Sequence, residues 1–415
     1  MIDNRVFKRP YSGRGRVILK ESGTMSMQYS RRSLFQLAGL AASATLSARY
    51  SFAQQAPEAQ PAPAKPKISN QRILPHPDPF PGLATRSTVA VIQGEDRRKN
   101  VYNSLKAIDD LIKPRLKGKK YILIKPNNVT TTNQLGATHA DALRGILDYF
   151  SERFKGPVII AESSAGDTMT GFENFKYPAL VSEYRKMKVS LLDLNAEQKY
   201  VLLPLIDYDL HVVPVRLAAR LMDPEAFIMG SAIFKTHNVA IVTLSVKNMV
   251  VGAPLHQPPG ETNRWNDKRR YHAGIRQSNY NFFLTAQFLS KNWGATIIDG
   301  FEGMEGNGPS SGTPVPHRVC VASTDYIAAD RVASELMGVD PNWLGWLKYL
   351  GEVGIGQTDL AKIDIRGNVP QLAALRRTYR MHADIDRQLK WMGPMEELPP
   401  NLGWVRSIDH DHRFA

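Results

Sequence analysis

The stretch FIMGSAIFKTHNVAIVTLSVKNMVVG (residues 227–252) organises the interpretation of this sequence. Its first half is an apolar run that is followed by Lys235 and His237. Its second half is a β-branched run, which predicts another strand that ends at Lys247 and Asn248. Burying an ammonium without a partner is costly, so lysines at the edges of such segments must face a polar cleft, an anion or a carboxylate. The stretch therefore predicts a binding site, although either lysine alone could also point into water from a strand end.

Apolar runs and helical patterns alternate on both sides of this stretch. Strands are expected at residues 88–93, 121–124, 157–161, 189–194, 295–298, 318–322 and 360–366, and helices at residues 101–112, 140–154, 177–186, 282–293, 326–337 and 370–392. Residues 201–216 contain Pro204 and Pro214, which predicts an antiparallel or edge hairpin. The alternation predicts an α/β fold with a largely parallel or mixed sheet sandwiched by helices, as one layered domain or as two α/β lobes with a cleft between them.

Composition divides the chain into four segments. Residues 1–53 form a leader, and residues 54–86 form a linker rich in Pro and Ala. Residues 87–368 form the predicted α/β domain, and residues 369–415 a C-terminal helix with an irregular tail. Within the domain, residues 253–281 make a long polar connection, which is typical of a lid or binding loop.

The leader has the features of an export signal. Arg31 and Arg32 precede a short, weakly apolar run and then small residues suited to signal peptidase. Twin arginines in this position predict export by the Tat translocase to the periplasm or another extracytoplasmic space. The apolar run is too short for a stable membrane span. Met25 or Met27 would give a more usual start for such a signal.

Charge and cysteine content narrow the function classes. Residues 1–53 contain nine Lys/Arg and two Asp/Glu, so half of the net charge of +14 lies in the leader and the remaining body is mildly basic. Such a body suits anionic small molecules, and no basic run interleaved with aromatics indicates a nucleic-acid partner. Cys320 is the single cysteine, so an iron–sulfur cluster cannot be held by the chain's own cysteines. Its apolar neighbours predict an inert core position.

Polar residues recur where predicted strands end. They are Lys125 and Asn127, Glu162 and Ser163, Lys235 and His237, and Asp299 and Glu302. In open α/β sheets, ligands bind beyond the carboxyl ends of the strands. These positions therefore predict one composite cleft for an anionic small molecule.

Roles within the cleft follow from side-chain chemistry. Lys235, His237 and Lys247 are predicted to bind the anion and to perform acid–base catalysis. Groups predicted to hold the substrate are Lys125, Asn127, Ser163, Asn248, Asn307 and Gly308. Carboxylates that suit a hard divalent metal are Glu162, Asp299, Glu302 and Glu305. Structural alternatives stay open for three of these assignments. His237 could have a purely structural role, Glu162 could cap a helix, and residues 299–312 could form a glycine-rich loop without a ligand.

Five motifs resemble one known family. They are IKPNNV (124–129), AESS (161–164), IFKTHNVAIVTLSVKN (233–248), IDGFEGMEGNGPSSG (298–312) and ASTDYIAADRVASELMG (322–338). In this order they resemble the DUF362 family, a domain of unknown function, over residues 88–367. The family has no single established reaction, and many members add a ferredoxin-like module, for which this sequence lacks the cysteines. The family is also distantly similar to nickel-dependent lactate racemase, whose site uses lysine and histidines around a nickel-pincer cofactor, but that is an analogy of fold.

The sequence thus supports three functional hypotheses. The first is a Tat-exported protein that binds an anionic small molecule as an acid–base or metal-assisted enzyme. The second is a non-catalytic periplasmic binding or accessory protein, and the third is a redox partner that uses an external cofactor. The oligomeric state, the metal and the substrate stay open at this level.

Overall fold

The computed structural model describes residues 82–392, apart from 262–266, 273 and 370. The predicted leader, most of the linker and the tail from residue 393 lie outside these ranges. The first strand of the described chain is β1 (Ser87–Gln93). Within the described part of the chain, no helix combines the length and apolarity needed to cross a membrane.

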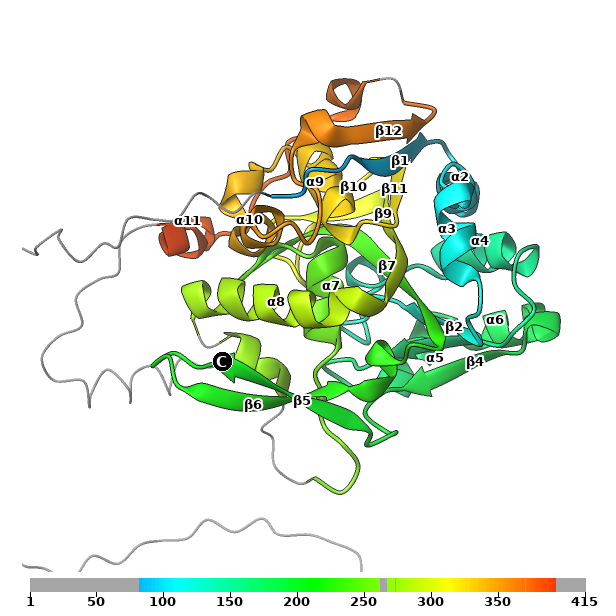
Figure 1. The fold of residues 1–415 in the computed structure, drawn as a ribbon, viewed down its shortest axis with the longest axis horizontal. Coiled ribbons are helices and arrows are strands. Elements are labelled where there is room, and N and C mark those ends of the chain that lie inside the picture. The colour runs from blue at the N-terminus through cyan, green and yellow to red at the C-terminus, as the bar shows by residue number, and fades with distance from the viewer. Residues whose placement is uncertain (1–81, 262–266, 273, 370, 393–415) are drawn as a thin grey trace, which may run out of the picture. The chain divides into compact units, whose positions relative to one another are not determined.

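One mostly parallel sheet forms the centre of the fold (Figure 1). Its strands follow the order β12-β1-β11-β9-β7-β2-β3-β4. Their bounds are β2 (Tyr121–Lys125), β3 (Val158–Glu162), β4 (Val189–Asp193), β7 (Ala226–His237), β9 (Trp293–Glu305), β11 (Val319–Ser323) and β12 (Ile363–Gly367). Only β11 runs antiparallel to its neighbours on this path, and β8 (Ile241–Val242) and β10 (Thr313–Val315) pair with β7 and β9. The α/β prediction is confirmed, in the form of one continuous sheet.

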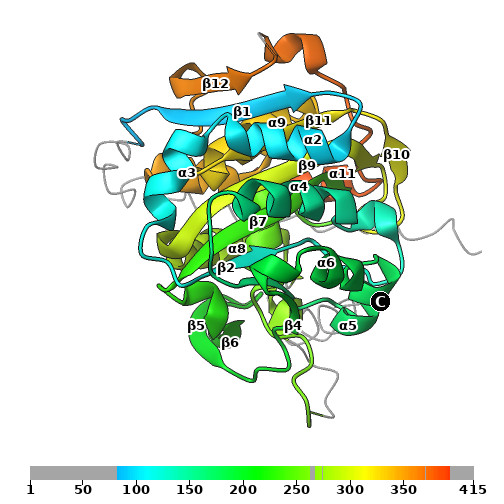
Figure 2. The same ribbon diagram turned by 90° about the vertical axis from the view of Figure 1, so that its right-hand side faces the viewer.

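Helices cover both faces of the sheet (Figure 2). One face carries α2 (Arg97–Lys106), α3 (Asp109–Leu116), α4 (Ala140–Ser151), α5 (Thr168–Asn174) and α6 (Pro178–Glu183). The other carries α7 (Leu244–Gly252), α8 (Ile275–Leu289), α9 (Tyr326–Leu336) and α10 (Gly345–Glu352). Alternate strand residues enter different cores, as Ala90 does relative to Val89 and Val91. Every residue of β7 is buried, because a parallel sheet covered on both faces has no solvent side.

A small hairpin and short turns complete the fold. β5 (Tyr200–Ile206) and β6 (Val212–Ala218) form a separate antiparallel pair in which Pro204 faces Pro214, so the predicted hairpin is confirmed. Cys320 is buried on β11, as predicted for a core residue. The short 3-10 helices are η2 (Gln134–Gly136), η3 (Arg185–Met187), η4 (Ala219–Met222), η5 (Asp267–His272), η6 (Ser290–Asn292), η7 (Pro341–Trp343), η8 (Leu360–Lys362), η9 (Leu372–Leu375) and η10 (Lys390–Met392).

The second half of the central stretch departs from prediction. Only β8 is extended, and the chain then enters α7, which places Lys247 and Asn248 on a helix rather than at a strand end. Asp330 of α9 accepts hydrogen bonds from the backbone N–H groups of Ser245 (2.7 Å) and Val246 (2.9 Å). A carboxylate at a helix N-terminus satisfies donors that have no partner inside the helix. This tertiary contact outweighs the β propensity of the run.

Three further element predictions are corrected. The glycine-rich segment that follows Ile298 continues β9 as far as Glu305, because β7 and β10 pair with it there. The helix expected at residues 101–112 is two helices, α2 and α3, and the first begins earlier than predicted, at Arg97, with Asp96 as its N-cap. The helix expected at residues 370–392 is replaced by η9, α11 (Ile385–Leu389) and η10, with irregular chain between η9 and α11.

Asp330→Ala should destabilise the protein by about 2–4 kcal/mol, because two buried N–H groups of α7 would lose their acceptor. Asp330→Asn keeps one acceptor oxygen, so it should destabilise the protein less than Asp330→Ala does. Chemical denaturation at pH 7 measures the effect, with the exposed helix cap variant Asp96→Ala as the control. A loss no larger than that of Asp96→Ala would contradict this role for Asp330.

Candidate functional site

A small polar pocket lies beyond the carboxyl ends of β2 and β3, against α7. Its polar lining residues are Lys125, Asn127, Asn128, Glu162, Ser163, Lys247, Asn248 and Lys268. The pocket has a volume of about 30 Å³. One water molecule needs roughly 10–15 Å³ by the same measure, so the space suits a group of a few atoms. Six of the predicted site residues meet here, at the sheet edge where the sequence placed them.

A buried ion pair forms the floor of this site. Lys125 Nζ donates to both oxygens of Glu162, at 2.8 and 2.9 Å. Glu162 also accepts from the backbone N–H groups of Ser163 (2.9 Å) and Asn128 (3.0 Å). Burial lowers the pKa of Lys125, and the charge of Glu162 opposes that shift. Glu162 was predicted as a metal ligand. Both of its carboxylate oxygens already accept hydrogen bonds from the protein.

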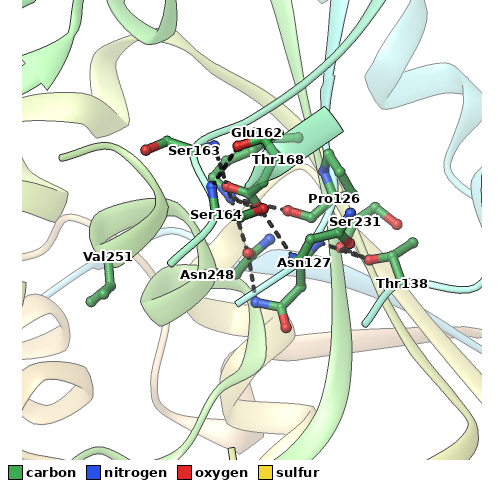
Figure 3. A network of polar contacts seen from close by, with 12 residues as sticks. Pro126, Asn127, Thr138, Glu162, Ser163, Ser164, Thr168, Ser231, Asn248 and Val251 are labelled. Carbon is green, nitrogen blue, oxygen red and sulfur yellow. Dashed lines mark hydrogen bonds and ion pairs between the residues drawn. The ribbon is translucent and has the colours of Figure 1, made fainter. Parts of the chain in front are cut away.

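Two asparagines extend the ion pair into a polar network (Figure 3). Asn248 Oδ1 accepts from Lys125 Nζ (3.2 Å) and from Asn127 Nδ2 (2.8 Å). Asn248 Nδ2 and Asn127 Oδ1 are buried, and neither has a hydrogen-bonding partner among the described residues. Such atoms cost about 1–3 kcal/mol each when they stay unsatisfied. Buried polar atoms without a partner are unusual in native proteins, and both residues line the pocket.

Two further buried lysines line the pocket. Lys247 makes no hydrogen bond to any residue that the structure describes, and burial, with Lys268 and Lys125 nearby, lowers its pKa to about 7. Lys268 Nζ donates to the backbone oxygen of Val251 (2.8 Å) in the last turn of α7, a favourable place for a cation. Burial lowers the pKa of Lys268 to about 7, although Glu162 opposes the shift.

Lys235 and His237 lie on β7 but do not line the pocket. Lys235 Nζ donates to the backbone oxygen of Gly136 (2.7 Å), and burial followed by the charge of Lys247 holds its pKa well below the usual range. Burial also holds the pKa of His237 well below its usual range. His237 Nδ1 accepts from the backbone N–H of Val239 (3.0 Å), so the neutral ring carries its proton on Nε2. The catalytic roles of these two residues stay predictions.

The three β9 carboxylates predicted as metal ligands do not converge. Asp299 is buried against Arg97, with Nε 3.0 Å from Oδ2, and Glu305 accepts from the backbone N–H of Arg380 (3.0 Å). Glu302 is exposed, because side chains along a strand alternate between its two faces. In the described ranges, no three His, Cys, Asp or Glu side chains lie close enough together to hold a metal ion.

The remaining predicted residues fall into two groups. Ser163 lines the pocket, with its Oγ 3.0 Å from Asn195 Oδ1. Asn307 lies elsewhere, and its Oδ1 accepts from the backbone N–H of Ala383 (3.2 Å). Gly308 packs on β7 so closely that a Cβ would stand 2.0 Å from the backbone oxygen of Thr236. The structure thus gives Gly308 a packing role outside the pocket.

Comparison with known proteins identifies the family to which this sequence belongs. The sequence model described as "Domain of unknown function (DUF362)" matches residues 122–335, just over half of the chain. The chain belongs to the DUF362 family. No match was found among curated proteins. A crystal structure of a protein from Thermotoga maritima is 9% identical with a TM-score of 0.33, over 51% of this DUF362 chain and 52% of that protein.

Sequence reasoning missed Lys268 and Asn128 as pocket residues of this DUF362 protein. Lys268 begins a run of three basic residues that would ordinarily lie in solvent. The polar connection that carries it folds back on the hairpin, where Arg216 pairs with Glu261 and Asp267. The position of Lys268 within a predicted binding loop was the one sequence feature that pointed to a role in the pocket. Only tertiary contacts distinguish Lys268 from the two arginines that follow it.

Gly252→Ala should disturb the site without removing any charge. Its Cβ would stand 2.0 Å from Lys125 Cε and 2.2 Å from Nζ, so Lys125 must move away from Glu162. Breaking such a buried pair costs up to about 3–5 kcal/mol. A double-mutant cycle with Lys125→Met, followed by denaturant unfolding, measures the coupling. Strictly additive losses would show that the glycine is not needed for the ion pair.

The stability of the protein should rise with pH above neutrality because of Lys247. Below pH 7 this lysine is charged in both states, so its burial penalty is fully present. Between pH 7 and its ordinary pKa of 10.5, the unfolded chain binds more protons than the native chain, so raising the pH favours folding. Lys247→Met should therefore stabilise the protein at pH 6 by a few kcal/mol, roughly, and by much less at pH 10. Denaturant titrations of both proteins check this, and a pH-independent difference would contradict it.

Proposed function

We propose that this DUF362 protein binds a small anionic molecule in the pocket and performs acid–base chemistry on it. One observation carries the proposal: Lys247 is buried in the pocket wall, and the residues that the structure describes offer its ammonium no hydrogen-bonding partner. An uncompensated buried cation is costly, and a bound anion removes that cost. The anion would also favour the charged form of the lysine.

The charge balance of the lining supports the same conclusion. Glu162 is the single carboxylate among the lining residues, and Lys125 already pairs with it. Lys247 and Lys268 thus remain without a carboxylate partner in the lining. Asn248 Nδ2 adds a neutral donor in the same wall. Together these groups form an anion-binding set without a second negative charge to oppose it.

Lys247 is also suited to move a proton. Its pKa of about 7 keeps a substantial neutral fraction near physiological pH, which is the condition for a general base. In complexes where Lys247 is still neutral, Lys268 and Asn248 would hold the anionic group, and the amine would accept a proton from an adjacent acidic position to become the ammonium that the anion favours. Proton abstraction beside a carboxylate is the reaction class that these groups fit best.

We also propose that the protein works outside the cytoplasm after transport by the Tat translocase. The support is the pair Arg31 and Arg32 ahead of a short apolar run, in a part of the chain outside the described residues. N-terminal sequencing of the exported protein tests this, and a mature chain that still contains both arginines would contradict it.

Lys247→Met should abolish most of the anion binding. Isothermal titration of the wild-type protein with inorganic phosphate and with acetate should show binding of at least one anion, with proton uptake near pH 7.5. The variant should bind at least about tenfold more weakly, since hydrogen bonds to charged groups contribute roughly 1.5–3 kcal/mol. Lys99→Met is the matched control, because the Lys99 side chain is 78% exposed.

Two results would count against this proposal. One is a wild-type protein that binds neither anion. The other is a Lys247→Met variant that binds as tightly as the control. Binding by a protein that never catalyses exchange of acidic ligand protons with solvent would favour the non-catalytic binding function instead.

A further inference from the structure

We infer that the pocket selects anions that carry an O–H donor beside their acceptor oxygens. The inference rests on the proposed anion binding and specifies its ligand class. It comes from three residues of the pocket lining that each have one buried amide atom without a partner: Asn127 Oδ1, Asn128 Nδ2 and Asn248 Nδ2. Asn127 Oδ1 is the acceptor among them and the other two atoms are donors, so the ligand must present both kinds of group.

The orientation of the Asn127 and Asn248 amides is determined by their neighbours (Figure 3). Asn248 must direct Oδ1 toward Lys125, because Lys125 Nζ can only donate (3.2 Å). Asn127 must then direct Nδ2 toward that same oxygen (2.8 Å), because a rotated amide would place two acceptors against each other. Asn127 therefore leaves an acceptor unsatisfied, and Asn248 leaves a donor unsatisfied.

The charges in the lining restrict the kind of donor. An ammonium group on the ligand would approach Lys125, Lys247 and Lys268, and Glu162 is already paired. A neutral hydroxyl avoids this repulsion and still donates to Asn127 Oδ1. Its neighbouring oxygens accept from Lys247 and Asn248 Nδ2. A site built to hydrogen-bond a hydroxyl discriminates strongly against an analogue that lacks it, because the buried acceptor then has no partner.

Two ligand types share this chemistry. Phosphate carries a protonated oxygen at neutral pH, whereas sulfate does not. A small hydroxy carboxylate such as glycolate carries a hydroxyl, whereas acetate does not. The pocket volume of about 30 Å³ accommodates the reacting end of either type. Ordered water alone is the competing occupant, since it can also satisfy these amides.

Paired titrations of the full-length protein at pH 7 test the inference. Phosphate is compared with sulfate, and glycolate with acetate. In at least one pair the hydroxyl-bearing anion should bind tenfold or more tightly, and that pair identifies the ligand type. Asn127→Ala should lose this preference while it keeps affinity for the anion without a hydroxyl. Asn103→Ala, which changes an exposed asparagine of α2 outside the pocket lining, is the matched control and should retain the preference.

The outcomes separate the inference from the proposed function. Equal binding within both pairs would overturn the inference and leave anion binding intact, as expected if only water completes Asn127. Retained preference in Asn127→Ala would also overturn it. Failure of the wild-type protein to bind any of the four anions would overturn both. If Asn127→Ala does not fold, the wild-type comparison still decides.

Discussion

The buried ion pair between Lys125 and Glu162 joins the ends of two neighbouring parallel strands and positions everything around it. Lys125 is the last residue of β2 and Glu162 the last of β3. Glu162 also accepts hydrogen bonds from the backbone N–H groups of Ser163, directly after β3, and of Asn128, after β2. The same carboxylate therefore positions the start of both loops. Lys125 in turn orients Asn248 of α7. Because a buried charge that loses its partner is strongly destabilising, this arrangement has little freedom to vary.

The residues around this ion pair include buried polar groups that destabilise the fold unless a partner satisfies them. Lys247 and Lys268 are buried in the same pocket lining without carboxylate partners there, and burial lowers the pKa of each to about 7. Three amide atoms of lining asparagines also lack partners. Native proteins usually avoid such groups except where function requires them. Their concentration around one small pocket is the reason for proposing that this region binds a ligand.

Elements far apart in sequence build the pocket. Asp330 of α9 accepts hydrogen bonds from the first turn of α7, while Lys268 contacts the last turn of the same helix. The helix that carries Lys247 and Asn248 is thus held at both ends by residues outside the central stretch. Gly252 closes its last turn where the Lys125 side chain leaves no room for a Cβ. These contacts explain how a β-branched segment becomes a short, rigid helix beside the strand ends.

The sequence by itself determined the α/β class, the hairpin and the family, because apolar periodicity and motif order are local properties of a chain. It also placed Lys125, Asn127, Glu162 and Ser163 at one sheet edge, since parallel strands end together. Lys247 and Asn248 reach the same pocket from a helix that the sequence predicted as a strand. Only the tertiary structure separated these residues from Lys235, His237 and the β9 carboxylates, because burial and pairing depend on neighbours distant in sequence. For the same reason, only the fold brought Lys268 from a basic run into the pocket and made α7 a helix.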